Sequence, residues 1–272
     1  MPSVLANGVS LYYETTGSGN PLVLVHGGWG DHGSWRFVVD GLAGSYRVVT
    51  YDRRGHSQSE RSTDPAMLHA HEEDLVALVQ QLGVAPAHVV GNSIGASIAL
   101  RLAGRRPELF RSLCAHEPPS FELLRDDPET RPLYDEHIKK LKAVEELLVA
   151  GDMEGGARLF FETIAFGSGA WEQIPQESRR TFVSNGPTFL VETQDPEQLT
   201  IELDGLRRFP HPALLTQGDG SKPEFAPVVT KLAEAMPQPE RRIIVGAGHV
   251  PHLTHPADYI ALTLEFLSGI EN

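Results

Sequence analysis

The sequence is poor in cysteine, in clustered positive charge and in long hydrophobic runs. Its 272 residues include one cysteine, Cys114, which excludes an internal disulfide and is compatible with a reducing cytoplasm. Asp and Glu number 36 against 23 Lys and Arg, the formal net charge is −13, and no run of basic residues interrupts this excess. Nucleic acids and anionic membranes are therefore poor candidates as partners.

Neither a signal peptide nor a membrane span is expected. The first ten residues, MPSVLANGVS, lack the charged start and apolar core of a signal peptide. No apolar run approaches the ~20 residues that a transmembrane helix needs. We expect a folded, soluble protein of the cytoplasm, without a membrane partner. Its oligomeric state cannot be read from these features.

Short apolar runs alternate with helix-like stretches along most of the chain. PLVLVHGG, YRVVTYDRRG and AHVVGNS share a form typical of parallel strands buried on both faces. Two earlier strand-like runs are joined by Asn7-Gly8, a two-residue hairpin signal. The alternation predicts an α/β fold with a mostly parallel sheet. The helices predicted in this part of the chain cover residues 34–44, 65–83, 225–236 and 256–269.

The alternation stops between Pro118 and Pro210, where the sequence predicts helices only. We therefore divide the chain into a core of residues 1–118 and 210–272 and an inserted helical cap of residues 119–209. Aromatic side chains are frequent in the cap, and Phe121, Phe161 and Trp171 are candidates for contact with a substrate. The alternative for each of them is the hydrophobic core of the cap itself. The predicted cap helices cover residues 131–151, 152–166, 170–186 and 187–208.

Gly91-x-Ser93-x-Gly95 lies between an apolar strand and a run of helix formers, ASIALRLAG. A serine in a tight strand-to-helix turn exposes its Oγ at the end of the strand, and the flanking glycines leave room for the backbones packed beside it. The following helix also places its positive end near the serine. This context indicates a nucleophile elbow.

The motif and three further segments resemble the α/β-hydrolase fold family. VLVHGG (Val23 to Gly28) is similar to the family's oxyanion turn, DRRGHSQS (Asp52 to Ser59) to the stretch after its fourth strand, and GAGHVPHLTHP (Gly246 to Pro256) to its histidine loop. Two positions depart from the family pattern, Ser57 and Ala96, where glycine is common. The resemblance covers the chain apart from the cap and implies an eight-stranded, mostly parallel sheet flanked by helices.

The resemblance also implies roles for individual residues. Ser93 would be the nucleophile, His249 the general base, and the backbone N–H groups of Gly28 and Ile94 the oxyanion hole. Trp29 and Trp35 follow the oxyanion turn and are candidates for the acyl pocket, with burial in the core as the alternative. No metal and no organic cofactor is implied.

His249, His252 and His255 recur at three-residue spacing, but they do not match a helical zinc motif, because Pro251 and Pro256 disfavour a continuous helix. His252 is a candidate for the pocket lining or for simple packing, and no metal site is expected here.

The carboxylate that would hold His249 has two candidates. In most of the family it is an Asp three residues after the glycine that ends the seventh strand. Counted from Gly218, that position is Ser221, whereas Asp219 follows the glycine directly in a standard turn pair. Glu117, at the end of the strand LCAHEPP, is the other candidate and the preferred one, because an unpaired carboxylate there would be costly.

The expected function is that of a serine hydrolase acting with water on a small, fairly apolar ester, lactone or related acyl compound. The alternatives keep the fold and change the chemistry to C–C bond hydrolysis, lyase or cofactor-free oxygenase reactions. A ligand receptor with weak hydrolysis is a further alternative.

Overall fold

The computed structural model describes residues 2–61 and 67–271, which contain one eight-stranded sheet. The strand order is β1-β2-β4-β3-β5-β6-β7-β8, with β1–β2 and β2–β4 antiparallel and the other neighbouring pairs parallel. The predicted, mostly parallel sheet is confirmed. The strands are β1 (Ser3–Ala6), β2 (Val9–Thr16), β3 (Asn20–Val25), β4 (Tyr46–Tyr51), β5 (Ala87–Asn92), β6 (Phe110–His116), β7 (Ala213–Gly218) and β8 (Glu240–Ile244).

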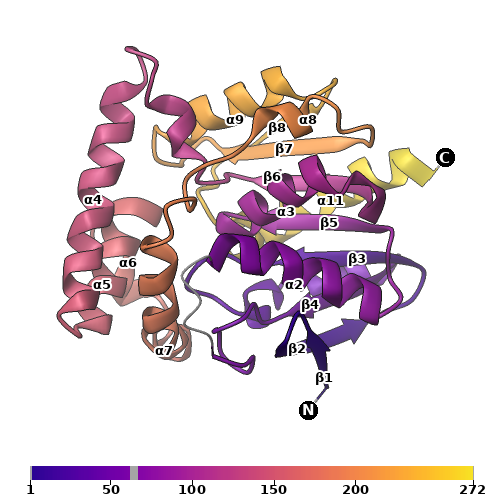
Figure 1. Cartoon of the computed structure of the whole chain (residues 1–272), viewed down its shortest axis with the longest axis horizontal. Helices are drawn as coiled ribbons and strands as arrows, with labels where there is room; N and C mark the ends of the chain where they lie inside the picture. The colour runs from indigo at the N-terminus through magenta and orange to yellow at the C-terminus, as the bar shows by residue number, and fades with distance from the viewer. Residues whose placement is uncertain (1, 62–66, 272) are drawn as a thin grey trace.

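Helices cover both faces of the sheet, which explains the continuous apolar runs of the parallel strands. In β3, Val23 and Val25 join one hydrophobic core with α2, α3 and α9, whereas Leu22 and Leu24 join another with α1 and α11. The alternation is the two-residue period of a strand. Figure 1 shows α2 and α3 crossing one face. These helices are α1 (Val39–Ala43), α2 (Met67–Gln81), α3 (Ile94–Arg105), α9 (Phe225–Ala235) and α11 (Pro256–Glu271).

Local signals place most of these elements correctly. Asn7 and Gly8 have φ angles of 47° and 78° and join β1 to β2 as the hairpin signal predicts. The helix predicted at 34–44 is instead a 3₁₀ turn, His32–Trp35, followed by the short α1. Its glycines lower helix propensity, and the turn buries Trp35 in the core. The predicted helix at 65–83 begins with residues 65–66, which lie outside the described part of the chain.

Between β6 and β7 the chain forms α4 to α8, of which α4 to α7 lie together beside the sheet in Figure 1, whereas α8 packs against α3. The helix predicted at 187–208 is interrupted, because residues 194–202 are not helical. The predicted break between Gly186 and Pro187 is wrong, because α7 runs through Pro187. Proline removes one helical hydrogen bond, but the buried contacts of Asn185, Thr188 and Glu192 on one face of α7 hold the helix together across it. These helices are α4 (Arg131–Val149), α5 (Met153–Phe160), α6 (Ala170–Gln173), α7 (Gln176–Thr193) and α8 (Leu203–Leu206).

The cap encloses a hydrophobic core of its own, to which Trp29 of the sheet domain contributes. The helix predicted at 152–166 is divided into α5 and a π-helical turn at Phe161–Ala165. Within residues 2–61 and 67–271, no helix is long and apolar enough to cross a lipid bilayer.

A tight approach between α3 and β3 gives a first prediction. A Cβ at Gly95 would lie 2.2 Å from the Val25 carbonyl oxygen and 2.6 Å from that of His26, so Gly95→Ala must displace backbone. We expect it to lower the free energy of unfolding by roughly 3 kcal/mol in urea denaturation. Gly269→Ala is the control, because a Cβ there meets no described atom within 4 Å and alanine favours helix α11. Equal stabilities for the two variants would contradict the prediction.

Candidate active site

Ser93 occupies the turn between β5 and α3, with φ of 57° and ψ of −128°. Such a positive φ is strained for serine. A Cβ at Gly91 would lie 2.5 Å from the Gly95 carbonyl oxygen, so the returning helix excludes a side chain at that position. The Ser93 N–H donates to the His116 carbonyl at 2.9 Å, which ties the turn to the neighbouring strand β6. The glycines of the motif are therefore required by close backbone contacts.

Glu117 and His249 form a buried carboxylate–imidazole pair. Glu117 Oε2 lies 2.8 Å from His249 Nδ1, and Glu117 Oε1 accepts a hydrogen bond from the Gly218 N–H at 2.8 Å. The φ of Glu117 is 45°, a left-handed conformation that turns its side chain toward β7 and the histidine loop. A carboxylate at Nδ1 fixes the tautomer that leaves Nε2 free to take a proton.

Glu117 is ionised at neutral pH. Burial raises the pKa of its carboxyl, but the hydrogen bond with His249 and the charges of His116 and His249 outweigh burial and lower the pKa to about 2. His249 is held from two further sides. The Phe225 ring stacks on it with centroids 4.5 Å apart, and Asn92 Nδ2 donates to its carbonyl oxygen at 2.8 Å. The imidazole therefore has one defined orientation.

The other candidate acid, Asp219, lies elsewhere. Its side chain is exposed, and Oδ1 accepts a hydrogen bond from the Gly246 N–H at 2.6 Å. It thus serves the turn before the histidine loop, and of the two carboxylates it is Glu117 that contacts His249.

A single apolar cavity brings most of the predicted site residues together. Its volume is about 100 Å³, of the same order as the ~150 Å³ apolar cavity that binds benzene. The predicted residues that line it are Gly28, Trp29, Ser93, Ile94, Phe121, Phe161, His249 and His252.

Trp171, which was predicted as a candidate for contact with a substrate, does not line this cavity. It is fully buried in the core of the cap, with its ring centroid 6.0 Å from that of Phe161. Trp35 is likewise a core residue, 4.4 Å from the ring of His252.

Comparison with known proteins agrees with this geometry. The model of the alpha/beta hydrolase family matches residues 22–262. The chain belongs to the alpha/beta hydrolase family. The uncharacterized hydrolase YraK of Bacillus subtilis (strain 168) is 40% identical over 119 residues, which span 43% of this chain and only 44% of that relative.

Two solved structures are similar over nearly the whole chain. The enol-lactonase from Burkholderia xenovorans LB400 has a TM-score of 0.82 at 19% identity, covering 98% of this chain and 100% of that one. A thermophilic esterase from Thermogutta terrifontis has a TM-score of 0.82 at 21% identity, covering 100% and 99%. At these identities the likeness shows the fold.

In this α/β hydrolase, side chains hold the carbonyl groups of residues 27–30, the turn after β3 that contains the predicted oxyanion residue Gly28. His26 Nδ1 and Arg53 Nη2 lie 2.8 and 3.1 Å from the Gly27 oxygen. His56 Nε2 lies 2.7 Å from the Gly28 oxygen. Asn185 Nδ2 donates to the oxygens of Trp29 and Gly30 at 3.2 and 3.0 Å. All four carbonyl groups of the turn are thereby engaged.

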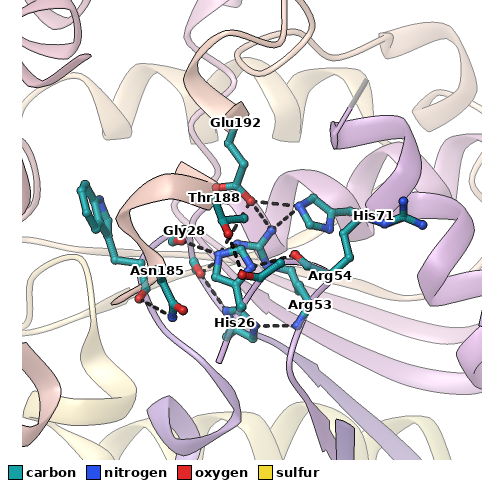
Figure 2. A network of polar contacts seen from close by, with 12 residues as sticks. His26, Gly28, Arg53, Arg54, His71, Asn185, Thr188 and Glu192 are labelled. Carbon is teal, nitrogen blue, oxygen red and sulfur yellow. Dashed lines mark hydrogen bonds and ion pairs between the residues drawn. The ribbon is translucent and has the colours of Figure 1, made fainter. Parts of the chain in front are cut away.

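Helix α7 of the cap supplies much of this support (Figure 2). Besides Asn185, Thr188 donates to the Gly55 carbonyl at 2.6 Å. Glu192 Oε1 lies 2.5 Å from Arg53 Nη1 and 2.9 Å from His71 Nε2. Burial and the Arg53 charge lower the pKa of His71 well below its usual value, so the ion pair of Arg53 and Glu192 carries the charges of the network.

The Ser57 departure from the family pattern fits the same network. Its φ is 40°, a conformation that favours glycine. Its N–H donates to Asn185 Oδ1 at 2.9 Å and its hydroxyl to Asp31 Oδ2 at 2.9 Å. These two hydrogen bonds offset the strain of the positive φ at Ser57.

Among the described residues, Asp31, His32 and Asp52 form a group whose ligand atoms lie within 4.8 Å of one another. The group is already engaged internally, since Asp52 accepts from the backbone N–H groups of His32 and Gln58 and lies 2.6 Å from His32 Nδ1. His249, His252 and His255 do not belong to it.

Several residues of the site carry no recognisable sequence signal. Asn185 and Glu192 lie at the cap contact, and their helix spans a proline at which a break was predicted. His137 of α4 and Phe225 of α9 also line the cavity. A partial signal existed for His137, because it shares the helical spacing of the buried residues Leu141, Val144 and Leu148.

The buried ion pair gives a second prediction. Arg53 and Glu192 are each about 1% exposed, so Glu192→Gln leaves a buried guanidinium without its countercharge. We expect a loss of about 3 kcal/mol in the free energy of unfolding, measured by urea denaturation.

The matched control is Glu197→Gln. Glu197 pairs with Arg101 at 2.6 Å, but its side chain is 57% exposed, so the loss should stay below about 1 kcal/mol. If Glu192→Gln is no more destabilising than Glu197→Gln, the buried ion pair does not stabilise the folded protein as predicted.

Proposed function

We propose that this chain is a serine hydrolase that cleaves small, fairly apolar esters, lactones or related acyl compounds through an acyl-enzyme. The observation that carries the proposal is the Glu117–His249 pair at 2.8 Å, whose imidazole lines the same cavity as the elbow residue Ser93. Nucleophile, base and base-orienting carboxylate are the three parts that acyl transfer of this type requires.

The reaction would proceed in two stages. Ser93 Oγ attacks the acyl carbon while His249 Nε2 takes the hydroxyl proton, and His249 then returns that proton to the departing alcohol. A water molecule, deprotonated by His249, attacks the resulting ester of Ser93. The tetrahedral intermediate collapses to the free acid, and the proton passes back to Ser93. These steps need neither a metal nor an organic cofactor.

Negative charge that develops on the carbonyl oxygen would be stabilised by the N–H groups of Gly28 and Ile94. The C=O and N–H of a trans peptide point in opposite directions, so the contacts that hold the Gly27 carbonyl also orient the Gly28 N–H. One such donor contributes roughly 2.7–4 kcal/mol to transition-state stabilisation.

Substrate class follows from the lining of the cavity. Its walls are mostly apolar side chains, among them Phe160, Phe161, Ile164 and Phe189, which favour an apolar acyl or alcohol group. The volume of about 100 Å³ favours a small one. Esterase and lactonase activities are named for proteins with the same fold, which agrees with this class.

The proposed function predicts different outcomes for the two carboxylates. With p-nitrophenyl acetate as substrate, Glu117→Gln should lower kcat by a factor of roughly 10³–10⁴, because the tautomer and charge support of His249 are lost. Asp219→Asn should stay within about threefold of the wild type, since Asp219 serves a turn. Circular dichroism would establish that both variants fold. A loss confined to Asp219→Asn would overturn the assignment.

Labelling with a fluorophosphonate probe tests the nucleophile. Wild-type protein should be labelled and Ser93→Ala should not, with the adduct located by mass spectrometry. Folded wild-type protein that resists the probe would contradict the proposed function. Labelling without turnover of any ester would instead favour a receptor or a lyase reaction.

A further inference from the structure

The cap contributes an almost wholly apolar wall to the cavity. Among the described residues, the polar side chains that the cap places in the lining are His137 and Gln198. His137 belongs to α4 and is 3% exposed. A polar ring in an apolar wall is costly unless its nitrogen atoms have partners.

One of its two nitrogen atoms has such a partner. His137 Nδ1 lies 3.3 Å from Oε1 of Glu224, the residue just before α9, which is itself 3% exposed. Burial raises the pKa of Glu224, but the hydrogen bond with His137 outweighs it, so the pKa is lowered and the carboxylate can only accept. The proton of the ring therefore lies on Nδ1.

The other nitrogen, Nε2, is left as a hydrogen-bond acceptor. Burial lowers the pKa of His137 despite the opposing effect of Glu224, so the ring is neutral at physiological pH. Nε2 has no hydrogen-bond partner within residues 2–61 and 67–271, and the ring lines the cavity. A neutral imidazole in this tautomer accepts a hydrogen bond and cannot donate one at Nε2.

His137 and His249 line the same cavity and are linked by a chain of ring contacts. The Phe225 ring stacks on His249 at 4.5 Å, the Phe121 ring is 5.3 Å from Phe225, and His137 is 3.9 Å from Phe121. Two phenyl rings thus connect the imidazole of His249 to the imidazole of the cap. A substrate group that makes a contact with His137 would therefore be a different group from the ester that faces Ser93 and His249.

We propose that His137, oriented by Glu224, forms an acceptor subsite that selects acyl substrates carrying a hydroxyl or N–H group remote from the scissile bond. The apolar wall between the two histidines would hold the carbon chain that joins the two ends of such a substrate. The inference rests on the proposed function and narrows its substrate class.

Matched ester pairs test the subsite. The two members of each pair end in a hydroxyl or a methyl group, placed on the acyl side in one series and on the alcohol side in another. In at least one series we expect the wild type to prefer the hydroxyl ester in kcat/KM by about tenfold, the effect of one buried hydrogen bond. His137→Phe should abolish that preference, and His137→Gln, which keeps an acceptor, should restore part of it.

His69→Phe is the matched control, because His69 is exposed on α2 and should leave the ratio unchanged. A purely structural role for His137 would change the rates for both esters together and leave their ratio intact. An equal ratio in wild type and His137→Phe would therefore overturn the inference.

Binding separates this inference from the proposed function. Calorimetry on the Ser93→Ala variant would compare ligands of the same two series, with the double variant Ser93→Ala/His137→Phe beside it. Tighter binding of the hydroxyl-terminated ligand, lost in the double variant, supports the subsite even if no ester is hydrolysed. Turnover by the wild type with no such binding difference would sustain the hydrolase and contradict the subsite.

Discussion

The ion pair of Arg53 and Glu192 is the contact on which the arrangement of the site depends. It joins α7 of the cap to the segment after β4, with the two charged atoms 2.5 Å apart in a fully buried setting. The same guanidinium contacts the Gly27 carbonyl, so one side chain connects the cap to the turn after β3. A cation buried to this extent has no low-energy alternative, because separating it from its countercharge without water is costly. Residues of both the cap and the sheet domain line the cavity, so its shape depends on how this ion pair attaches the cap.

Two carboxylate–imidazole pairs lie along that cavity, and their surroundings differ. Glu117 holds His249, which lines the cavity together with Ser93 and is the base of the proposed function. Glu224 holds His137 in the apolar wall, where a ring nitrogen can only recognise a neighbour. In each pair the carboxylate sets the tautomer, and in each the free nitrogen is available to the cavity. Under the proposed function, the first pair serves catalysis and the second serves recognition of the substrate.

Much of the fold could be predicted because its signals are local. Asn7-Gly8 specifies a hairpin, the apolar runs specify buried parallel strands, and the glycines beside Ser93 specify a tight turn, all within a few residues. The break expected before Pro187 shows where local signals are insufficient. Contacts of α7 with the sheet domain outweigh the hydrogen bond that proline removes, and those contacts join residues more than a hundred positions apart.

The sequence by itself determined the fold class and the tight turn at Ser93, because the glycines beside this serine leave one steric solution, whereas His249 was predicted from the resemblance of its loop to that of the family. It left the carboxylate open between Glu117 and Asp219. Only the tertiary structure decided, since β6 lies between β5 and β7 and its end therefore reaches both the serine turn and the histidine loop. Only the tertiary structure, likewise, places Trp171 in the core of the cap and His137 in the lining of the cavity. Which side of a cap helix faces the cavity depends on how the cap packs on the sheet, and that packing has no counterpart in local spacing.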